Sequence, residues 1–407
     1  MKIWFVLTTN HYFYGGETLP RQADNISVGM TAALTGRYSL PGRQALLGAQ
    51  AWVEDTNRAG GLWLQESGQR LPLRLIYYDD TSEAQRCGAL TERLITEDQV
   101  DILLGPYSSG LALRAAEVAQ RYQRVLWNHG GASETIYARG CTWVVGILSP
   151  PRTYFHSLID FARHALPHAR RVALVHSTAG AFPRDVAAGA EWYCQQQGLE
   201  IIHTYPYPAG TVDFTPILTQ LAAVSPAVVL NVGRIEDDLR FAVQYVQHNI
   251  AASVVGLIVT PLTLFRDTLG SAAVQFLGPS QWEPEIVSQP DYGPSSQEVF
   301  ARLSVCHPAG VDYPMAQAYA GGLVVQRCIE TAGTLDQHVL RQVAGRLDFT
   351  TFYGRYRIDP STGRQIGHRM PVVQWQEGHK IVVWPVPAPA DRPSSSKRRG
   401  GGDTLEP

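Results

Sequence analysis

A repeated alternation of short apolar segments and amphipathic segments constrains the fold of this chain most strongly. The alternation recurs about every 30 residues, which is the length of a strand–helix–strand unit with parallel strands. The first series has predicted strands at 25–33, 73–78, 102–104 and 125–127. A second series follows Ser149-Pro150-Pro151, with predicted strands at 171–176, 200–205, 227–231 and 254–259 and helices at 185–197 and 215–224. The pattern predicts an α/β protein of two doubly wound, Rossmann-like lobes.

Composition excludes several classes of function. The chain has 407 residues, 45% of them apolar and 17% charged, as in a globular protein with substantial cores. Its net charge of -2 gives no long-range attraction to nucleic acid or anionic lipid, so we predict neither partner. No apolar run approaches the ~20 residues of a membrane span. The five cysteines lack C-x-x-C spacing, which argues against a disulfide framework or a zinc site.

The segment from Val100 to Gly110 carries the clearest sign of a binding site. An apolar strand runs into a Gly-Pro turn, two serines follow, and an amphipathic helix is predicted from Leu111. This order presents free backbone N–H groups and the positive end of a helix dipole, which suit an anion. Ser109 is also a plausible N-cap residue, so helix capping alone is the competing interpretation.

Both ends of the chain are predicted to lie outside the lobes. We expect residues 1–24 to form a leader or an N-terminal arm. Lys2 followed by Ile3–Leu7 is typical of the start of an export signal, but the apolar stretch is short and no cleavage site follows. The start is therefore either an incomplete export signal, with a periplasmic location, or part of a protein that stays in the cytoplasm. Residues 386–407 are rich in Pro, Ser, Gly and basic residues and are predicted to be disordered.

Six short stretches, in the same order along the chain, connect it to a known family. They are Leu34–Gly36, 54–61, Tyr78–Asp80, 100–109, Phe352–Gly354 and Val373–Gln376. Together they resemble the bacterial branched-chain amino-acid binding proteins, the solute receptors of ABC importers. The resemblance covers about residues 25–385 and depends on the sum of the stretches.

The resemblance implies the type I periplasmic-binding fold, in which two lobes joined by three hinge crossings close on a ligand. We expect the crossings near Ser149–Pro150, Gly278–Trp282 and Leu347–Phe352. The lobes would then hold residues 25–149 plus 280–347 and residues 150–279 plus 348–385. We also expect 352–358 to form a hairpin with a return strand at 370–376.

The resemblance also implies where a ligand would bind. Its carboxylate would be held by two loops of the first lobe, at Ser108, Ser109, Gly131, Ala132 and Ser133. Backbone N–H groups and hydroxyls can satisfy a carboxylate without a buried counter-charge. Tyr38 and Phe182 would form apolar walls from the two lobes, and Trp282 is expected in a hinge loop that faces the cleft.

One position departs from the family pattern. Amino-acid receptors of this family usually carry a second-lobe carboxylate for the ligand's ammonium group, but Ile258–Thr260 contains no acid. Glu236 and Glu283, in neighbouring predicted loops, are candidates to replace it. The competing interpretation is that both are exposed loop charges and that the ligand lacks an amine.

The predicted function is that of an ABC-importer receptor that captures an amino acid or a related small polar solute by lobe closure and delivers it to a membrane permease. An amide or amino-acid sensor with the same fold remains the alternative. Neither interpretation needs a cofactor, and the chain has no G-x-G-x-x-G or P-loop motif.

A hydrolase is the main enzymatic alternative, because a serine lies between a predicted strand and a predicted helix. A nucleophile elbow needs glycines two positions before and two positions after the serine. Ser108 has Pro106 before it, and Ser109 has Tyr107 and Leu111 at those positions. We therefore predict no enzyme.

Overall fold

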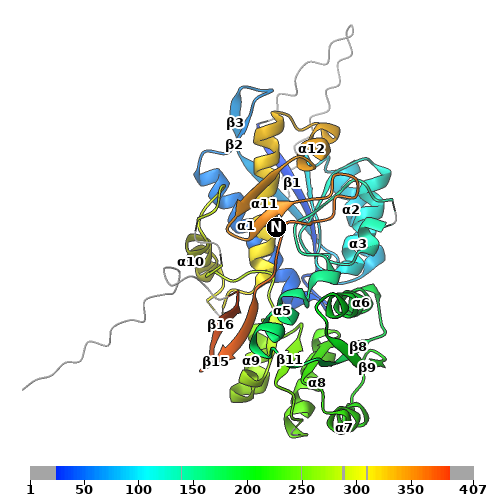
Figure 1. The fold of residues 1–407 in the computed structure, drawn as a ribbon. Helices are drawn as coiled ribbons and strands as arrows, with labels where there is room; N and C mark the ends of the chain where they lie inside the picture. Colours follow the sequence, from blue (N-terminus) through cyan, green and yellow to red (C-terminus); the bar gives the residue numbers. More distant parts are fainter. Residues whose placement is uncertain (1–23, 139, 249, 287–288, 309, 386–407) are drawn as a thin grey trace, which may run out of the picture.

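The computed structural model describes residues 24–138, 140–248, 250–286, 289–308 and 310–385. Residues 1–23 of the predicted leader and the predicted tail at 386–407 lie outside these ranges. The described chain forms two lobes, which lie one above the other in Figure 1. Each lobe has its own sheet, with helices on both faces of it.

The first lobe is built on a five-stranded parallel sheet in the order β4-β1-β5-β6-β7. Its strands are β1 (Ile26–Ala32), β4 (Leu73–Asp79), β5 (Ile102–Leu104), β6 (Leu126–Asn128) and β7 (Val144–Gly146). Its main helices are α1 (Ser39–Arg58), α2 (Ala84–Thr96), α3 (Ser109–Arg121) and α11 (Tyr313–Ala332). Helices α1 and α11 lie together on the opposite side of the sheet from α2 and α3 (Figure 1).

Strand β1 shows why this sheet is covered on both faces. All seven of its residues are buried. Val28 and Met30 belong to the core beneath α1 and α11. The alternate positions carry small residues, and a Cβ added at Gly29 would lie 2.9 Å from the side chain of Val100. Large residues therefore face one helical layer, and small ones allow the other layer to approach closely.

The second lobe is built on a seven-stranded sheet in the order β16-β15-β12-β11-β10-β8-β9. Its strands are β8 (Arg171–Ser177), β9 (Glu200–Tyr207), β10 (Val228–Val232), β11 (Val254–Leu257), β12 (Leu277–Pro279), β15 (Val372–Gln376) and β16 (His379–Trp384). Its helices are α5 (His156–Ala165), α6 (Ala181–Gln196), α7 (Thr215–Val224), α8 (Ile235–Gln247) and α9 (Thr263–Leu269). Separate hydrophobic cores lie on the two faces of this sheet.

The two sheets share one topology. If the parallel strands of each lobe are numbered along the chain, both sheets run in the order 2-1-3-4-5. In doubly wound sheets of this order, ligands bind beyond the carboxyl ends of the strands. The predicted two-lobed, doubly wound α/β fold is therefore confirmed.

Smaller elements complete the described chain. They are β2 (Leu62–Leu64), β3 (Gln69–Leu71), α4 (Thr135–Ala138), η1 (Pro151–Thr153), η2 (Gly270–Gln275), α10 (Ser296–Cys306), α12 (Gln337–Ala344), β13 (Asp348–Thr351) and β14 (Gly354–Arg357). Within the described ranges, no helix is both long enough and apolar enough to cross a membrane.

The third crossing lies further along the chain than the predicted Leu347–Phe352. Strands β13 and β14 pair with each other, and Phe349 and Tyr356 join the core of the first lobe. The Tyr356 hydroxyl donates to the carbonyl of Ala344 at 3.0 Å. The predicted return strand pairs instead with β12 and β16. Large aromatic side chains hold the hairpin on the first lobe, so the chain crosses between Ile358 and Met370.

Candidate functional site

A cleft of about 670 Å³ lies between the lobes. The first lobe contributes the loops after β1, β5 and β6 and the first turns of α11. The second lobe contributes the loops after β8, β10 and β11. All these loops follow the carboxyl ends of parallel strands, where the topology places a ligand.

Most of the predicted site residues line this cleft. Those that do are Tyr38, Ser108, Ser109, Ala132, Ser133, Phe182 and Glu236. Gly131 lies between two lining residues, and its own N–H donates to Asn128 Oδ1 at 2.8 Å.

Trp282 and Glu283 do not line the cleft. Trp282 is 3% exposed, stands edge-to-face on Phe352 at 5.6 Å between ring centroids, and donates from Nε1 to the Phe352 carbonyl at 3.0 Å. It therefore serves as a core residue. Glu283 is buried, with Lys380 Nζ 2.9 Å from its carboxylate. Burial raises the pKa of Glu283 to about 7, although Lys380 opposes the shift. Lys380 therefore supplies the counter-charge of Glu283, and no ligand ammonium group is needed for it.

The two serines at the start of α3 have different roles. Ser109 is the first residue of the helix, and its Oγ accepts the N–H groups of Ala132 at 3.2 Å and Ser133 at 3.1 Å. The Ser109 hydroxyl therefore already accepts hydrogen bonds from two N–H groups that the resemblance assigns to a ligand carboxylate. Ser108 stands at the N-cap position but makes no capping bond. Its Oγ is buried and has no hydrogen-bond partner among the described residues. Ser108 therefore offers the free hydroxyl.

A close backbone contact fixes these loops. A Cβ at Gly130 would lie only 2.4 Å from the carbonyl oxygen of Pro106, so only glycine fits there without a shift. Asn128 braces the same turn, because its Nδ2 donates to the Gly131 carbonyl at 2.6 Å and to the Tyr137 hydroxyl at 3.0 Å. The two first-lobe loops therefore form one rigid unit beneath the cleft.

Gln317, which the sequence analysis missed, is the most unusual first-lobe residue in the cleft. It follows Tyr313 by one turn of α11, lines the cleft and is 0% exposed. Neither atom of its side-chain amide has a hydrogen-bond partner in the described part of the chain. An unpaired buried amide costs folding free energy, so its presence indicates a functional role. A single glutamine in the apolar first half of this helix was the only signal in the sequence.

Aromatic rings form the walls of the cleft. The rings of Tyr38 and Tyr107 are 6.5 Å apart, and those of Tyr154 and Phe182 meet edge-to-face at 5.1 Å. A side-chain hydrogen bond joins Tyr107 to Tyr313, and burial raises the pKa of both hydroxyls. The hydroxyls therefore stay protonated, and the walls suit a partly apolar solute.

Charged groups differ between the mouth and the interior. Arg37, Arg184, Arg234 and Glu236 line the cleft and are exposed. Asp238 lines the cleft from the second lobe but is 1% exposed. The sequence analysis missed Asp238, because it placed neighbouring Glu236 in a loop, whereas both residues lie in the first turn of α8. The net positive mouth favours the approach of an anionic group.

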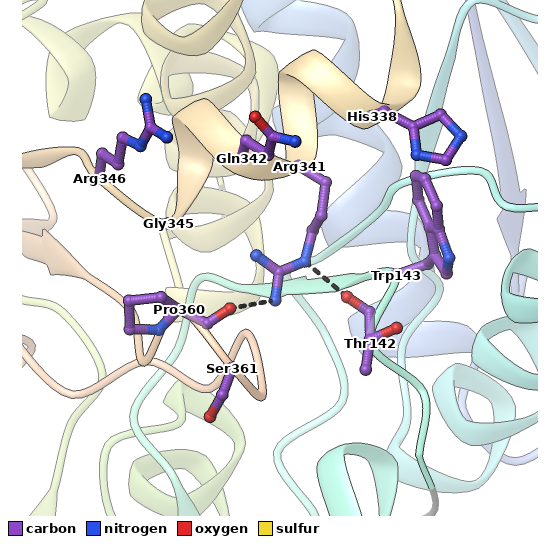
Figure 2. A pocket seen from close by; sticks show the side chains of 9 residues that line it. All are labelled: Thr142, Trp143, His338, Arg341, Gln342, Gly345, Arg346, Pro360 and Ser361. Atoms are coloured by element: carbon purple, nitrogen blue, oxygen red, sulfur yellow. Dashed lines mark hydrogen bonds between the residues drawn. The ribbon is translucent and has the colours of Figure 1, made fainter.

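A second hollow, of about 430 Å³, lies on the outer surface of the first lobe. Figure 2 shows its lining, including Trp143, His338 and Arg341. The Arg341 guanidinium spans it, donating from Nε to the Thr142 carbonyl at 2.5 Å and from Nη2 to the Pro360 carbonyl at 3.0 Å. Because these bonds tie α12 to two loops, we interpret this arginine as structural and place the functional site in the cleft.

The described residues contain no group of three or more His, Cys, Asp or Glu side chains placed to hold a metal ion. The polar groups of the cleft are hydroxyls, amides, arginines and two carboxyls. Such groups bind and orient a solute through hydrogen bonds and charge.

Comparison with known proteins agrees with this geometry. The profile of the periplasmic binding protein family matches residues 25–380. Among curated relatives, the Leu/Ile/Val-binding protein homolog 7 of Brucella abortus is 21% identical over 384 residues, covering 90% of this chain and 92% of the relative.

Solved structures show the same fold. The branched-chain amino-acid substrate-binding protein LivJ from Streptococcus pneumoniae, solved with isoleucine, matches with a TM-score of 0.72 at 16% identity, covering 88% of this chain and 99% of LivJ. A solute-binding protein of R. palustris, solved with 4-hydroxybenzoate, matches with a TM-score of 0.72 at 20% identity, covering 88% and 95%.

Proposed function

The chain belongs to the periplasmic binding protein family, and on that premise we propose that it is the solute-binding receptor of an ABC importer. The receptor captures a small solute in the cleft and closes its lobes around it. The observation that carries this proposal is the pair of buried, unpartnered first-lobe groups in the cleft, Ser108 Oγ and the Gln317 amide. A bound solute would supply their missing hydrogen bonds.

The first-lobe groups fit a carboxylate or a similar acceptor. The Ser108 hydroxyl and the Gln317 NH₂ group can both donate, and the N-terminus of the 13-residue helix α3 points its dipole toward the same region. The aromatic walls would enclose an apolar side chain. Isoleucine and 4-hydroxybenzoate, the ligands of the two solved relatives, each combine a carboxylate with an apolar body.

The partner and the location follow from this function. A receptor that closes on its solute presents a surface formed by both lobes. A membrane permease is the partner that would bind this surface. Proteins of this kind act outside the cytoplasmic membrane, so we place the chain in the periplasm.

A thermal-shift screen of the full chain tests the proposal. The panel holds amino acids, short amides and aliphatic and aromatic carboxylates, each up to millimolar concentration. A solute at 100 times its Kd stabilises the folded state by about 2.7 kcal/mol, a clearly measurable shift. We expect a hit among compounds that carry a carboxylate. If no compound stabilises the protein, or if the hit is hydrolysed during incubation, the receptor function is refuted.

A further inference from the structure

Three arginines line the cleft, one from the first lobe and two from the second. Arg37 lies in the loop between β1 and α1, Arg184 lies near the start of α6, and Arg234 immediately precedes α8. All three side chains are exposed, and none forms an ion pair with a carboxylate of the described residues. Arg184 and Arg234 also place positive charge at the positive ends of two helix dipoles, which costs folding free energy. Stability therefore does not explain the positions of these two arginines.

The contacts of the three side chains leave guanidinium N–H groups available to a ligand. Arg184 donates from Nε to the Gly180 carbonyl at 3.0 Å, and its two Nη groups have no partner among the described residues. The Arg37 guanidinium lies 4.6 Å from the ring centroid of Tyr38, on one wall of the cleft. The Arg234 side chain makes no hydrogen bond within the described part of the chain. The planar fork of a guanidinium group matches the two oxygens of a carboxylate.

The acids of the cleft do not neutralise this charge. Glu236 lines the cleft but forms no ion pair with any of the three arginines. Asp238 is 1% exposed, and burial raises its pKa well above its usual range, with the Asp237 carboxyl adding to the shift. Asp238 is therefore a protonated, neutral acid. The remaining charged groups give the cleft a net positive charge, although the chain as a whole carries a net charge of -2.

Lobe closure makes this positive charge costly unless an anion lies between the arginines. Arg37 belongs to one lobe and Arg184 and Arg234 to the other, so closure brings like charges closer and removes water from them. The buried end of the cleft already offers two neutral donors, Ser108 Oγ and the Gln317 amide, to one carboxylate. A solute with a single carboxylate at that end therefore leaves the arginines without a counter-charge.

We propose that the solute carries two carboxylates, so that the receptor selects dicarboxylates over monoanionic solutes of the same shape. This inference rests on the proposed function and narrows its substrate class. One carboxylate lies against Ser108 and Gln317. The other lies between Arg37 and the two second-lobe arginines, where it offsets the repulsion that opposes closure. The aromatic walls enclose the apolar body that joins the two carboxylates.

Isothermal titration calorimetry of the full chain tests this inference. The probes are the linear dicarboxylates from succinate to suberate, terephthalate and glutamate, each paired with its monoamide, which keeps the shape and loses one charge. Glutamine is the monoamide of glutamate. We expect the best dicarboxylate to bind at least about tenfold tighter than its monoamide. Between about 20 and 300 mM NaCl, its affinity should fall at least about threefold more than that of the monoamide.

The outcomes separate this inference from the receptor function. If a monoamide or a monocarboxylate binds as tightly as every dicarboxylate, or if salt weakens both members of the best pair equally, the proposal is overturned and the receptor function stands. If no compound of this panel or of the thermal-shift screen binds, the receptor function itself is refuted, and the proposal falls with it.

Variants separate the arginines from the rest of the cleft. Arg184→Gln and Arg234→Gln should each lower the ratio of dicarboxylate to monoamide affinity at least about threefold, and the double variant should bring it close to one. Arg346→Gln is the matched control, since Arg346 is also exposed but lines the outer hollow; it should leave the ratio unchanged. An unchanged ratio in the double variant overturns the proposal. The salt dependence of the wild type remains decisive if the double variant fails to fold.

Discussion

Ser149 Oγ lies 2.6 Å from His368 Nδ1, and this contact joins the segment between β7 and α5 to the segment between Ile358 and Met370. The segment between β12 and α10 enters the same network, because Gln281 Oε1 accepts the Ser149 N–H at 3.2 Å. From there the network reaches the cleft, since Gln281 Nε2 donates to the hydroxyl of Tyr154 at 2.8 Å. These three connecting segments, called the hinge below, are therefore hydrogen-bonded to one aromatic wall of the site, which couples the position of Tyr154 to their geometry.

The hinge histidine makes stability depend on pH. Burial lowers the pKa of His368 to about 4 in the folded chain, so the unfolded chain, with a pKa near 6.5, takes up the proton first as the pH falls. The contribution of neutral His368 is complete above about pH 6.5 and is lost between pH 6.5 and 4. Relative to wild type, the unfolding free energy of His368→Gln should thus improve by about 3 kcal/mol over that interval.

Urea unfolding at several pH values measures this difference. Comparing variant with wild type cancels carboxyls such as Glu283, whose raised pKa acts in the opposite direction. Exposed His338→Gln is the control. A free-energy difference for His368→Gln that stays constant from pH 7 to 4 would contradict a neutral buried histidine in the hinge.

Gln317→Leu should separate stability from binding. Replacing an unpaired buried amide by an apolar side chain of similar size should raise the unfolding free energy by about 1 kcal/mol. The same change should weaken solute affinity at least about tenfold, because a donor is lost. Gln326→Leu, on the same helix, is the matched control, since its amide bonds to Thr56 and Glu330. It should lose stability and keep affinity. If Gln317→Leu binds normally, Gln317 is not a ligand group.

Alanine substitution should mainly lower stability at Ser109 and mainly lower solute affinity at Ser108. Ser109→Ala leaves the N–H groups of Ala132 and Ser133 without their acceptor, so we expect a loss of about 1–2 kcal/mol in unfolding free energy. Ser108→Ala removes no internal bond and should change stability by less than about 0.5 kcal/mol while weakening affinity. Thermal unfolding and calorimetric titration of both variants provide the comparison. Equal stability losses would invalidate the distinction between the two hydroxyls.

A polar contact at the edge of the cleft joins the lobes. Asp312 Oδ1 accepts the N–H of Thr263 at 3.2 Å and its hydroxyl at 2.9 Å, and Oδ2 accepts from Gln44 Nε2 at 3.1 Å. Thr263 starts second-lobe helix α9, whereas Asp312 precedes α11 and Gln44 lies on α1. Thr263→Val should speed solute dissociation about fivefold in stopped-flow experiments, because one hydrogen bond between the lobes is lost. Thr268→Val, whose hydroxyl bonds within α9, should leave the rate unchanged.

Much of the fold could be predicted because buried parallel strands leave a strong pattern. The predicted helix at 215–224 matches α7, and the predicted strand at 171–176 lies within β8. The hairpin near residue 352 was assigned to the wrong lobe and the wrong partner strand. A local sequence pattern predicts that a segment is extended, but it does not predict which sheet or core the segment joins. Here aromatic packing holds the hairpin on the first lobe.

The site could be predicted only where a loop follows a strand with a recognisable motif. Ser108 and Ser133 follow β5 and β6 in such loops and do line the cleft. Gln317 and Asp238 lie within helices. Only tertiary structure shows that the Gln317 amide is buried without a partner among the described residues and that Asp238 is buried at the cleft. Trp282 was expected in the cleft, yet its size makes it a core residue once Phe352 packs against it.

Hydrogen–deuterium exchange of the full chain, with and without the solute found in the screen, tests solute capture between the lobes most directly. We predict slower exchange in loops of both lobes together, at 107–113 and 130–135 in the first and at 179–184 and 233–238 in the second. Protection confined to one lobe, or centred on the outer hollow around Arg341, would contradict capture by lobe closure.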